Sequence, residues 1–344
     1  MSNNSEPHAA VLAVDGGASK IDAVLLTAAG EVMGCARGEG TSFDPEDHDR
    51  SVAVLAATVR KARERAEIPP GAGPLARVGV FCMAGADLPA DDRRIAKALA
   101  GLRLADELIV RNDTFAVLRA GSERGWGIGV VCGTGLNCSG VGPDGRIVRY
   151  AALGLISGDE GGGGWLAEMG IGSAVRGRDG RGRRTALERA IPRHFGVRSP
   201  LAVVEGFHTG RFNGSQMRDV PPLVFRCAAE GDEVAAGLVD TLADEIVGMA
   251  ASAIRRLRLT RLDVEVVLGG GVVRGGDPRL MSRVRDGLLA VAPAAQITPF
   301  AGPPVAGSAL LGLDRLGASR ATKQVLRETL SHETLVAPPN VPGG

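Results

Sequence analysis

The sequence predicts an α/β protein built from two domains of the same topology. Apolar, β-prone segments alternate with helical patterns over the first 120 residues, as in mixed sheets covered by helices. The strand-and-turn pattern that opens the chain returns from residue 127, which indicates an internal repeat. A length of 344 residues also favours two domains over one.

The first domain is predicted to begin with a three-stranded meander, because short turns containing glycine separate its first three apolar runs. A helix then follows whose acidic residues come early and whose basic residues come late, the order that a helix dipole favours. In chain order we expect strands at 9–14, 21–28 and 32–38, a helix at 44–68, a strand and turn at 76–86, a helix at 89–102, a strand at 106–113 and a helix at 114–122.

The second domain is predicted to repeat the meander over 127–154. Residues 14–17 align with residues 131–134, and Gly30 falls nearly in step with Gly145. The rest is interpreted as an acidic glycine turn opening a helix at 157–175, an arginine loop at 176–184, mainly helices at 185–258, strand, glycines and helix at 263–289, a strand at 296–300, a helix at 303–318 and a disordered end at 333–344. The predicted domains are 1–120 and 121–320, followed by a C-terminal helix and flexible tail at 321–344.

Composition excludes several classes of partner. Forty Lys and Arg residues against 39 Asp and Glu residues give a net charge of +1, which argues against nucleic acid, and the arginine loop at 176–184 has no interleaved aromatic residue. No apolar run is long enough to cross a membrane, and the first residues do not have the pattern of a signal peptide. Five cysteines without a C-x-x-C pair disfavour disulfides and zinc, so we expect a cytoplasmic protein.

The segment Asp15-Gly16-Gly17-Ala18-Ser19-Lys20 joins two predicted strands. It is interpreted either as a hairpin turn or as a phosphate-binding loop. In the second interpretation the amides of Gly16 and Gly17 and the side chains of Ser19 and Lys20 face phosphates, and Asp15 faces Mg²⁺ through water. Dinucleotide and Walker A loops open helices instead, so the strand-to-strand context disfavours both.

The repeat places a second glycine loop, Gly133-Thr134-Gly135, after the first strand of the second domain. Two such loops from two domains could hold a triphosphate between them, with the Thr134 hydroxyl and the glycine amides as donors. A third glycine segment, Gly269-Gly270-Gly271, follows an apolar strand. Its bare backbone suits either close helix packing or the flat face of adenine.

Two acidic segments are candidates for catalysis and sugar binding. Asn112-Asp113-Thr114 lies where a strand gives way to a helix, so it is a helix cap or places a general base for phosphoryl transfer. The segment at 158–161, Gly-Asp-Glu-Gly, is likewise a cap or a set of carboxylates for sugar hydroxyls.

Taken together, these five motifs resemble the N-acetylglucosamine kinase family within the BadF/BadG/BcrA/BcrD ATPases, of the actin–hexokinase–Hsp70 superfamily. The resemblance covers roughly residues 10–318. It implies two ribonuclease H-like, actin-like ATPase domains around a central cleft. It also implies transfer of the γ-phosphoryl group of ATP, with Mg²⁺, to the 6-hydroxyl of N-acetylglucosamine or a related aminosugar. Similar kinases are often homodimers, and domain closure would exclude water.

The same resemblance implies roles for individual residues. Asp113 would accept the proton of the sugar hydroxyl, and the glycines at 269–271 would bind adenosine. The expected sugar-binding residues are Thr41, Ser42, Gly85, Asn112, Asp113, Gly135, Asn137 and Asp159.

Two departures leave the acceptor sugar open. Relatives often carry Thr-Asn where this chain has Thr41-Ser42, and Ser-Gly-Gly where it has Ala84-Gly85-Ala86. Glucosamine and N-acetylmuramic acid are alternative acceptors. Two other functions also stay open, an activating ATPase with an iron–sulfur cluster and a non-catalytic sugar sensor.

Overall fold

A computed structural model describes residues 7–43, 47–71 and 73–336. The chain divides into two compact units. The first consists of residues 1–129, 143–145 and 300–344, and the second of residues 130–142 and 146–299. The first unit therefore includes the C-terminal segment, whereas the sequence predicted two continuous domains that divide at residue 120.

The first unit is built on a five-stranded sheet in the order β3-β2-β1-β4-β5. Strands β1 and β2 and strands β2 and β3 pair antiparallel, while β1, β4 and β5 run parallel. The strands are β1 (Ala9–Gly16), β2 (Lys20–Leu26), β3 (Val32–Glu39), β4 (Ala76–Met83) and β5 (Ala105–Asn112). The helices are α1 (His48–Arg65), α2 (Pro89–Ala100), α3 (Asp113–Gly121), α12 (Val305–Arg315), α13 (Arg320–Thr329) and α14 (His332–Val336).

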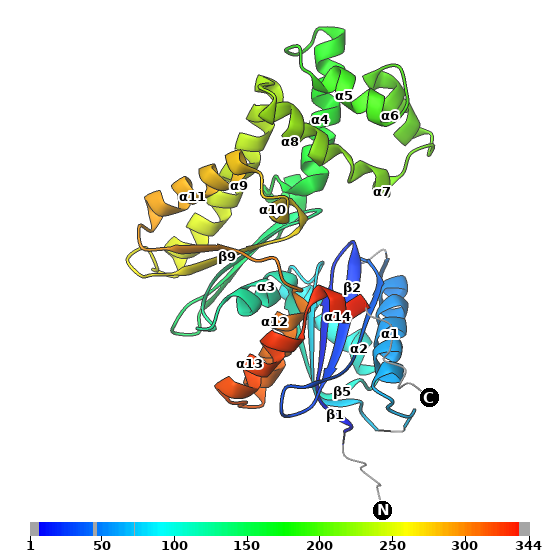
Figure 1. The fold of residues 1–344 in the computed structure, drawn as a ribbon, viewed down its shortest axis with the longest axis vertical. Coiled ribbons are helices and arrows are strands. Elements are labelled where there is room, and N and C mark those ends of the chain that lie inside the picture. The colour runs from blue at the N-terminus through cyan, green and yellow to red at the C-terminus, as the bar shows by residue number, and fades with distance from the viewer. Residues whose placement is uncertain (1–6, 44–46, 72, 337–344) are drawn as a thin grey trace, which may run out of the picture. The chain divides into compact units, whose positions relative to one another are not determined.

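Helices cover both faces of this sheet because both faces of its strands are apolar (Figure 1). In β1, Leu12 and Val14 pack with buried residues of α1 and α2. The alternate residues Val11 and Ala13 pack with buried residues of α12, α13 and α14. Such two-sided burial is typical of the central strands of α/β sheets.

The second unit repeats the strand order as β8-β7-β6-β9-β10, with β7 and β8 antiparallel and β9 and β10 parallel. Its strands are β6 (Gly127–Cys132), β7 (Leu136–Val141), β8 (Ile147–Arg149), β9 (Glu265–Gly269) and β10 (Gln296–Pro299). The 3₁₀ turn η2 (Gly154–Ser157) precedes the helices α4 (Gly162–Asp179), α5 (Leu187–His194), α6 (Pro200–His208), α7 (Gly214–Met217), α8 (Val220–Ala229), α9 (Glu233–Arg256), α10 (Gly271–Arg274) and α11 (Pro278–Val291). The predicted duplication of topology is thus confirmed.

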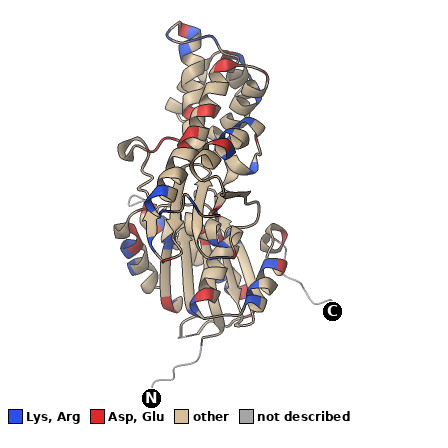
Figure 2. Cartoon of the chain, turned by 90° about the vertical axis from the view of Figure 1, so that its left-hand side faces the viewer, with Lys and Arg blue, Asp and Glu red and all other residues tan. Residues whose placement is uncertain are grey.

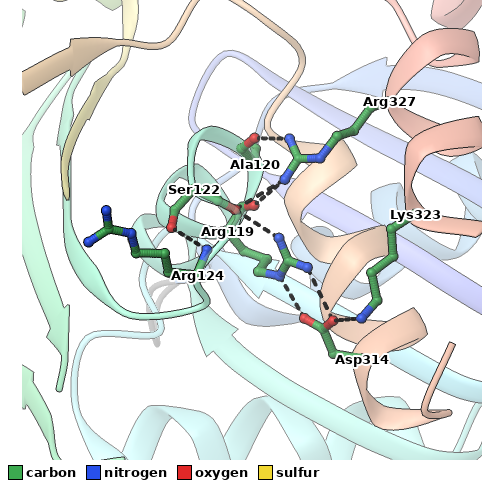
Figure 3. A network of polar contacts seen from close by, with 7 residues as sticks. All are labelled: Arg119, Ala120, Ser122, Arg124, Asp314, Lys323 and Arg327. Carbon is green, nitrogen blue, oxygen red and sulfur yellow. Dashed lines mark hydrogen bonds and ion pairs between the residues drawn. The ribbon is translucent and has the colours of Figure 1, made fainter. Parts of the chain in front are cut away.

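A polar network ties the C-terminal helices to α3 (Figure 3). Arg119 of α3 forms an ion pair with Asp314 of α12, with Nε and Oδ2 2.6 Å apart. Arg327 of α13 donates to the carbonyl oxygens of Ala120 and Ser122, at 2.5 and 3.1 Å. These bonds satisfy carbonyls at the end of α3 that no helical amide reaches.

Three predicted boundaries differ from the structure. Helix α4 begins at Gly162 rather than at the acidic turn, because Gly158, Gly161 and Gly162 have φ values of 75°, 137° and 86°, so regular right-handed backbone follows only after Gly162. The arginine loop begins only at Gly180, where a φ of 83° ends α4. Residues 333–336, which were predicted to be disordered, belong to helix α14 (His332–Val336), while residues 337–344 lie outside the described residues.

Charged residues of both signs are interspersed over each unit (Figure 2). Among the described residues, no helix is both long and apolar enough to span a bilayer.

Candidate active site

A row of polar residues crosses the first sheet where its parallel strands end. The backbone register pairs Asp15 of β1 with Asp22 of β2 on one side and with Cys82 of β4 on the other. The row continues to Arg37 of β3 and Arg111 of β5. Residues in register point to the same face of a sheet. The carboxyl ends of parallel strands are also where α/β sheets commonly bind ligands.

Asp22 binds two cations, Arg37 of this row and Lys20 at the start of β2. It is fully buried, and Arg37 donates to its two oxygens from Nε and Nη2, at 2.6 and 2.9 Å. Lys20 Nζ lies 2.9 Å from Oδ2 of the same carboxylate. The ammonium group that was predicted to face a phosphate therefore pairs with Asp22 in this structure.

Asp15 lies beside this ion cluster with only 6% of its surface exposed. Burial, followed by repulsion from Asp113 and Asp22, raises the pKa of Asp15 well above its usual range, although Lys20 and Arg37 oppose the shift. Three carboxylates thus interact with two cations. No three acidic, histidine or cysteine side chains of the described residues are grouped closely enough to ligate a metal ion directly, so a magnesium ion beside Asp15 would be held mainly through water.

Asp113 begins α3 and is held by its neighbours. Asn112 caps this helix, since its Oδ1 accepts from Thr114 N and Thr114 Oγ1 at 3.0 and 2.6 Å. Asn112 Nδ2 also donates to Asp87 Oδ1 at 2.8 Å. Burial raises the pKa of Asp113 to about 6, although backbone amides of Asp113 and Thr114 stabilise its charged form. A carboxylate with this pKa is a suitable proton acceptor near neutral pH.

The first glycine loop is a tight turn in this structure. Gly17 N donates to Lys20 O at 2.9 Å, so the hairpin uses one of the amides that was predicted to contact phosphate. Ala18 and Ser19 at the tip are exposed, and their groups are accessible to a ligand. A Cβ at Gly16 would approach the end of the Met83 side chain, so a larger residue there would require Met83 to move.

The predicted sugar-binding segments of the first unit lie against each other. Phe43 N donates to Ala84 O at 3.4 Å, and a Cβ at Gly85 would lie 3.0 Å from Phe43 N. Thr41 is buried, and its hydroxyl lies 2.5 Å from that of Ser51. Ser42 is half-exposed. The structure thus brings 41–43 and 84–86 together, with Thr41 supporting the segment from inside.

In the second unit three glycine segments converge. Gly163 N and Gly164 N, at the start of α4, donate to Gly133 O and Thr134 O at 2.7 and 2.8 Å. A Cβ at Gly162 would lie 2.6 Å from Gly135 Cα, and one at Gly270 would lie 2.8 Å from Gly133 N. This close approach is possible only without side chains. The Thr134-Gly135 tip stays exposed, and Gly271 begins α10 while Gly269 ends β9.

The other two predicted sugar ligands also lie in the second unit. Asn137 Oδ1 accepts from Cys138 N at 2.6 Å. Asp159 Oδ2 accepts from Ser157 Oγ at 2.5 Å. Burial, with repulsion from Glu160 and Asp159, raises the pKa of Glu245 on α9, so these three carboxylates share one acidic region.

All five cysteines are buried and free. Burial raises the pKa of the thiols of Cys82 and Cys132 to about 12. A cluster ligand is a thiolate, so these surroundings disfavour the iron–sulfur function that the sequence left open.

Sequence reasoning missed Asp22, Arg37 and Asp87. Asp22 and Arg37 each lie within a predicted strand, where a charged residue interrupts a mainly apolar run. That break was the available signal. Asp87 had no such signal, because its hydrogen bond to Asn112 joins segments 25 residues apart.

Residues 12–306 match the BadF/BadG/BcrA/BcrD ATPase family, and the chain belongs to this family. With the two sheets of equal strand order, this membership confirms the two-domain actin-like ATPase fold that the sequence predicted.

Individual relatives are more distant. An N-acetylmuramic acid/N-acetylglucosamine kinase of Clostridium acetobutylicum is 28% identical over 190 residues, which are 55% of this chain and 62%, less than two thirds, of that relative. An N-acetyl-D-glucosamine kinase of Dictyostelium discoideum is 22% identical over 315 residues, covering 88% of this chain and 97% of the relative. A crystal structure from Chromobacterium violaceum, assigned provisionally as an N-acetylglucosamine kinase, superposes with a TM-score of 0.66 at 23% identity, covering 88% of this chain and 98% of that one. This last likeness concerns the fold.

Proposed function

We propose that the protein is an ATP-dependent sugar kinase that phosphorylates the 6-hydroxyl of N-acetylglucosamine or a related aminosugar. The observation that carries the proposal is Asp113, a carboxylate with a pKa of about 6 at the start of α3, close enough to Asp15 for repulsion between them. Phosphoryl transfer needs a positioned hydroxyl, a proton acceptor and neutralised phosphate charge. Asp113 meets the second need. The names of the two curated relatives support the choice of acceptor.

The remaining roles follow from the same arrangement. Asn112 caps α3 and so orients Asp113. Asp113 accepts the hydroxyl proton as the sugar oxygen bonds to the γ-phosphorus, while the bond from that phosphorus to the bridging oxygen of the β-phosphate breaks and ADP leaves. Asp15 would hold Mg²⁺ through water, and the ion supplies charge neutralisation to the phosphates. Ser19 and Thr134 lie on exposed loop tips and are proposed to contact phosphates, with adenosine against Gly270 and Gly271.

The acceptor sugar is proposed to bind near Ser42, Gly85 and Asp87. Ser42 lacks the amide that relatives often carry, so a neighbouring group must recognise the acetamido substituent. Asp87 accepts from Asn112 Nδ2, so its carboxylate lies beside the cap of α3, and it is proposed as an acceptor for a sugar hydroxyl. Asn137 and Asp159 remain proposed sugar ligands of the second unit.

Coupled ADP release over N-acetylglucosamine, N-acetylmuramic acid, glucosamine and glucose tests the proposal. With the best acceptor, Asp113→Asn should lower kcat at least about 100-fold, because the amide cannot accept the proton. Binding of a fluorescent ATP analogue should stay within about threefold of wild type. For the wild type, log(kcat/KM) should fall as pH decreases below about 6, where Asp113 becomes protonated.

The matched control is Asp106→Asn, an exposed aspartate of β5 in the same unit. This variant should leave kcat unchanged, and its log(kcat/KM) should fall at acid pH as that of the wild type does. Retention of kcat within about tenfold in Asp113→Asn would exclude Asp113 as the base. Absence of ADP release with every acceptor, despite ATP binding, would favour a sugar sensor instead.

A further inference from the structure

A hollow of about 970 Å³ lies in the helical part of the second unit. It is bounded by α5, by α8 and by the segment that leads into α9. Four arginines line it, namely Arg184, Arg189, Arg193 and Arg226. Nothing proposed for phosphoryl transfer uses these residues.

Three of the arginines form no ion pair within the described part of the chain, although Glu230 and Asp232 also line the hollow. Among the residues that the structure describes, the guanidinium groups of Arg189, Arg193 and Arg226 have no hydrogen-bond or ion-pair partner. Arg189 and Arg193 are one helical turn apart and share a face of α5, while Arg226 comes from α8. Arginines held on two packed helices present a preformed set of donors for a phosphate.

A buried carboxylate completes the hollow. Glu188 of α5 lines it and is only 9% exposed. Its Oε1 accepts from Thr185 N at 3.1 Å and lies 3.1 Å from Arg184 Nε, whereas its Oε2 is buried without a hydrogen-bond partner. A buried oxygen in this state requires a donor. A ligand that carries hydroxyl or amine groups as well as a phosphate could bind the arginines and, once the Glu188 side chain turns toward the hollow, its unpaired oxygen.

The walls of the hollow are fixed. Asp232, the cap of α9, accepts from Thr185 Oγ1 at 2.9 Å and from Ala186 N at 2.6 Å. These bonds anchor the start of α5 to the start of α9. The backbone that carries Arg189 and Arg193 is therefore fixed relative to α9.

The hollow lies far from the glycine segments of the same unit. The start of α4 contacts Gly133 and Thr134, whereas Gly177, near its end, lies against Glu188. A helix of 18 residues is about 27 Å long. Figure 1 shows α10 near the start of α4 and α5 near its other end. A ligand in the hollow therefore does not occupy the proposed nucleotide site.

We propose that this hollow binds a phosphorylated, hydroxyl-bearing small molecule such as a sugar phosphate, with its phosphate on Arg189, Arg193 and Arg226 and a hydroxyl or amine on Glu188. The proposal does not depend on the kinase function. It assigns the second unit a ligand site separate from phosphoryl transfer.

Hydrogen–deuterium exchange of the full chain tests this site, with N-acetylglucosamine 6-phosphate, inorganic phosphate and N-acetylglucosamine as probes. The sugar phosphate should slow exchange in α5 (187–194) and α8 (220–229), inorganic phosphate should do so more weakly, and the free sugar should have no effect. In Arg193→Glu/Arg226→Glu the concentration needed should rise at least tenfold. Mapping to segments separates this binding from any product binding at the glycine loops.

Arg285→Glu is the matched control, because Arg285 is an exposed arginine of α11 outside the hollow. It should bind as wild type does. If the double variant unfolds, Arg189→Gln, at an exposed position, should still weaken binding. The proposal would be overturned if about 10 mM sugar phosphate did not slow hydrogen–deuterium exchange in α5 and α8. It would also be overturned if the sugar phosphate slowed exchange equally in the double variant, or if the free sugar slowed it as much as the sugar phosphate does.

Discussion

At the scale of single residues, Asp113 links the proposed chemistry to stability. Its pKa rises from an ordinary value of 3.8 to about 6, mainly because of burial. Between these values the folded chain keeps a proton that the unfolded chain releases, so the free energy of unfolding falls as pH rises through this window. This decrease in the free energy of unfolding persists at neutral pH, because the folded chain then holds a desolvated carboxylate.

Asp113→Asn should therefore stabilise the protein while it abolishes turnover. We expect the free energy of unfolding at pH 7.5 to rise by about 1–2 kcal/mol, less than the full shift, because part of Asp113 is exposed and an amide oxygen accepts the backbone hydrogen bonds more weakly than a carboxylate does. The gain should vanish near pH 4. Urea denaturation at both pH values measures it, with Asp106→Asn as the neutral control. A less stable Asn variant at pH 7.5 would contradict the argument.

The sequence located Asp113 and Asp15 because each follows an apolar strand at a turn. It could not show that Asp22 binds Lys20 and Arg37, because that contact depends on the register of β2 with β3. Register is set by the folded sheet. The position of these carboxylates at strand ends was thus predictable from the sequence, whereas their cross-strand partners were not, and the roles assigned to them stay predictions.

At the scale of elements, the start of α4 determines the shape of the second glycine loop. Its amides donate to Gly133 O and Thr134 O, and Gly162 approaches Gly135 with a φ of 86°. The sequence predicted a helix near this point from its acidic turn. It missed the true start by several residues because positive φ values do not follow from a glycine-rich pattern alone.

Gly162→Ala tests whether this contact shapes the nucleotide site. The new Cβ would lie 2.5 Å from Gly135 C and occupy a left-handed backbone, so the Thr134-Gly135 tip must move. ATP affinity, measured with a fluorescent analogue, should fall at least about tenfold.

Gly172→Ala is the control within the same helix. A Cβ there meets no atom within 4 Å, and the change should leave ATP affinity unaltered while it stabilises α4 by about 0.5–1 kcal/mol. Equal ATP affinity in both variants would remove the reason to place phosphates at this loop.

At the scale of the whole chain, the first unit is completed by the last residues. Helix α12 packs on β1, and a Cβ at Gly312 would collide with Val11. Arg327 contacts carbonyls at the end of α3, the helix that begins with Asp113 (Figure 3). Sequence patterns are local, so they predicted these helices but could not assign them to the first sheet.

A chain that ends at Gly317 should therefore have a much less stable first unit, although the sequence alone predicted only a helix and flexible tail after residue 320. Truncation removes Leu326, Leu330 and Leu335, which are 0%, 5% and 0% exposed. At about 1.5–3 kcal/mol for each buried leucine, the loss is of the order of 5 kcal/mol, comparable with the stability of a domain. Calorimetry should show a melting temperature at least about 10 °C below that of a chain ending at Val336.

A pair of point variants separates this packing from a general effect of truncation. Leu326→Ala empties a fully buried position of α13 and should cost about 2–5 kcal/mol, whereas Val325→Ala changes a neighbour that is 36% exposed and should cost less than about 1 kcal/mol. Because Arg327 follows directly and contacts the end of α3, Leu326→Ala should also lower kcat with the best acceptor. If both variants melt within 2 °C of wild type, α13 does not stabilise the first unit.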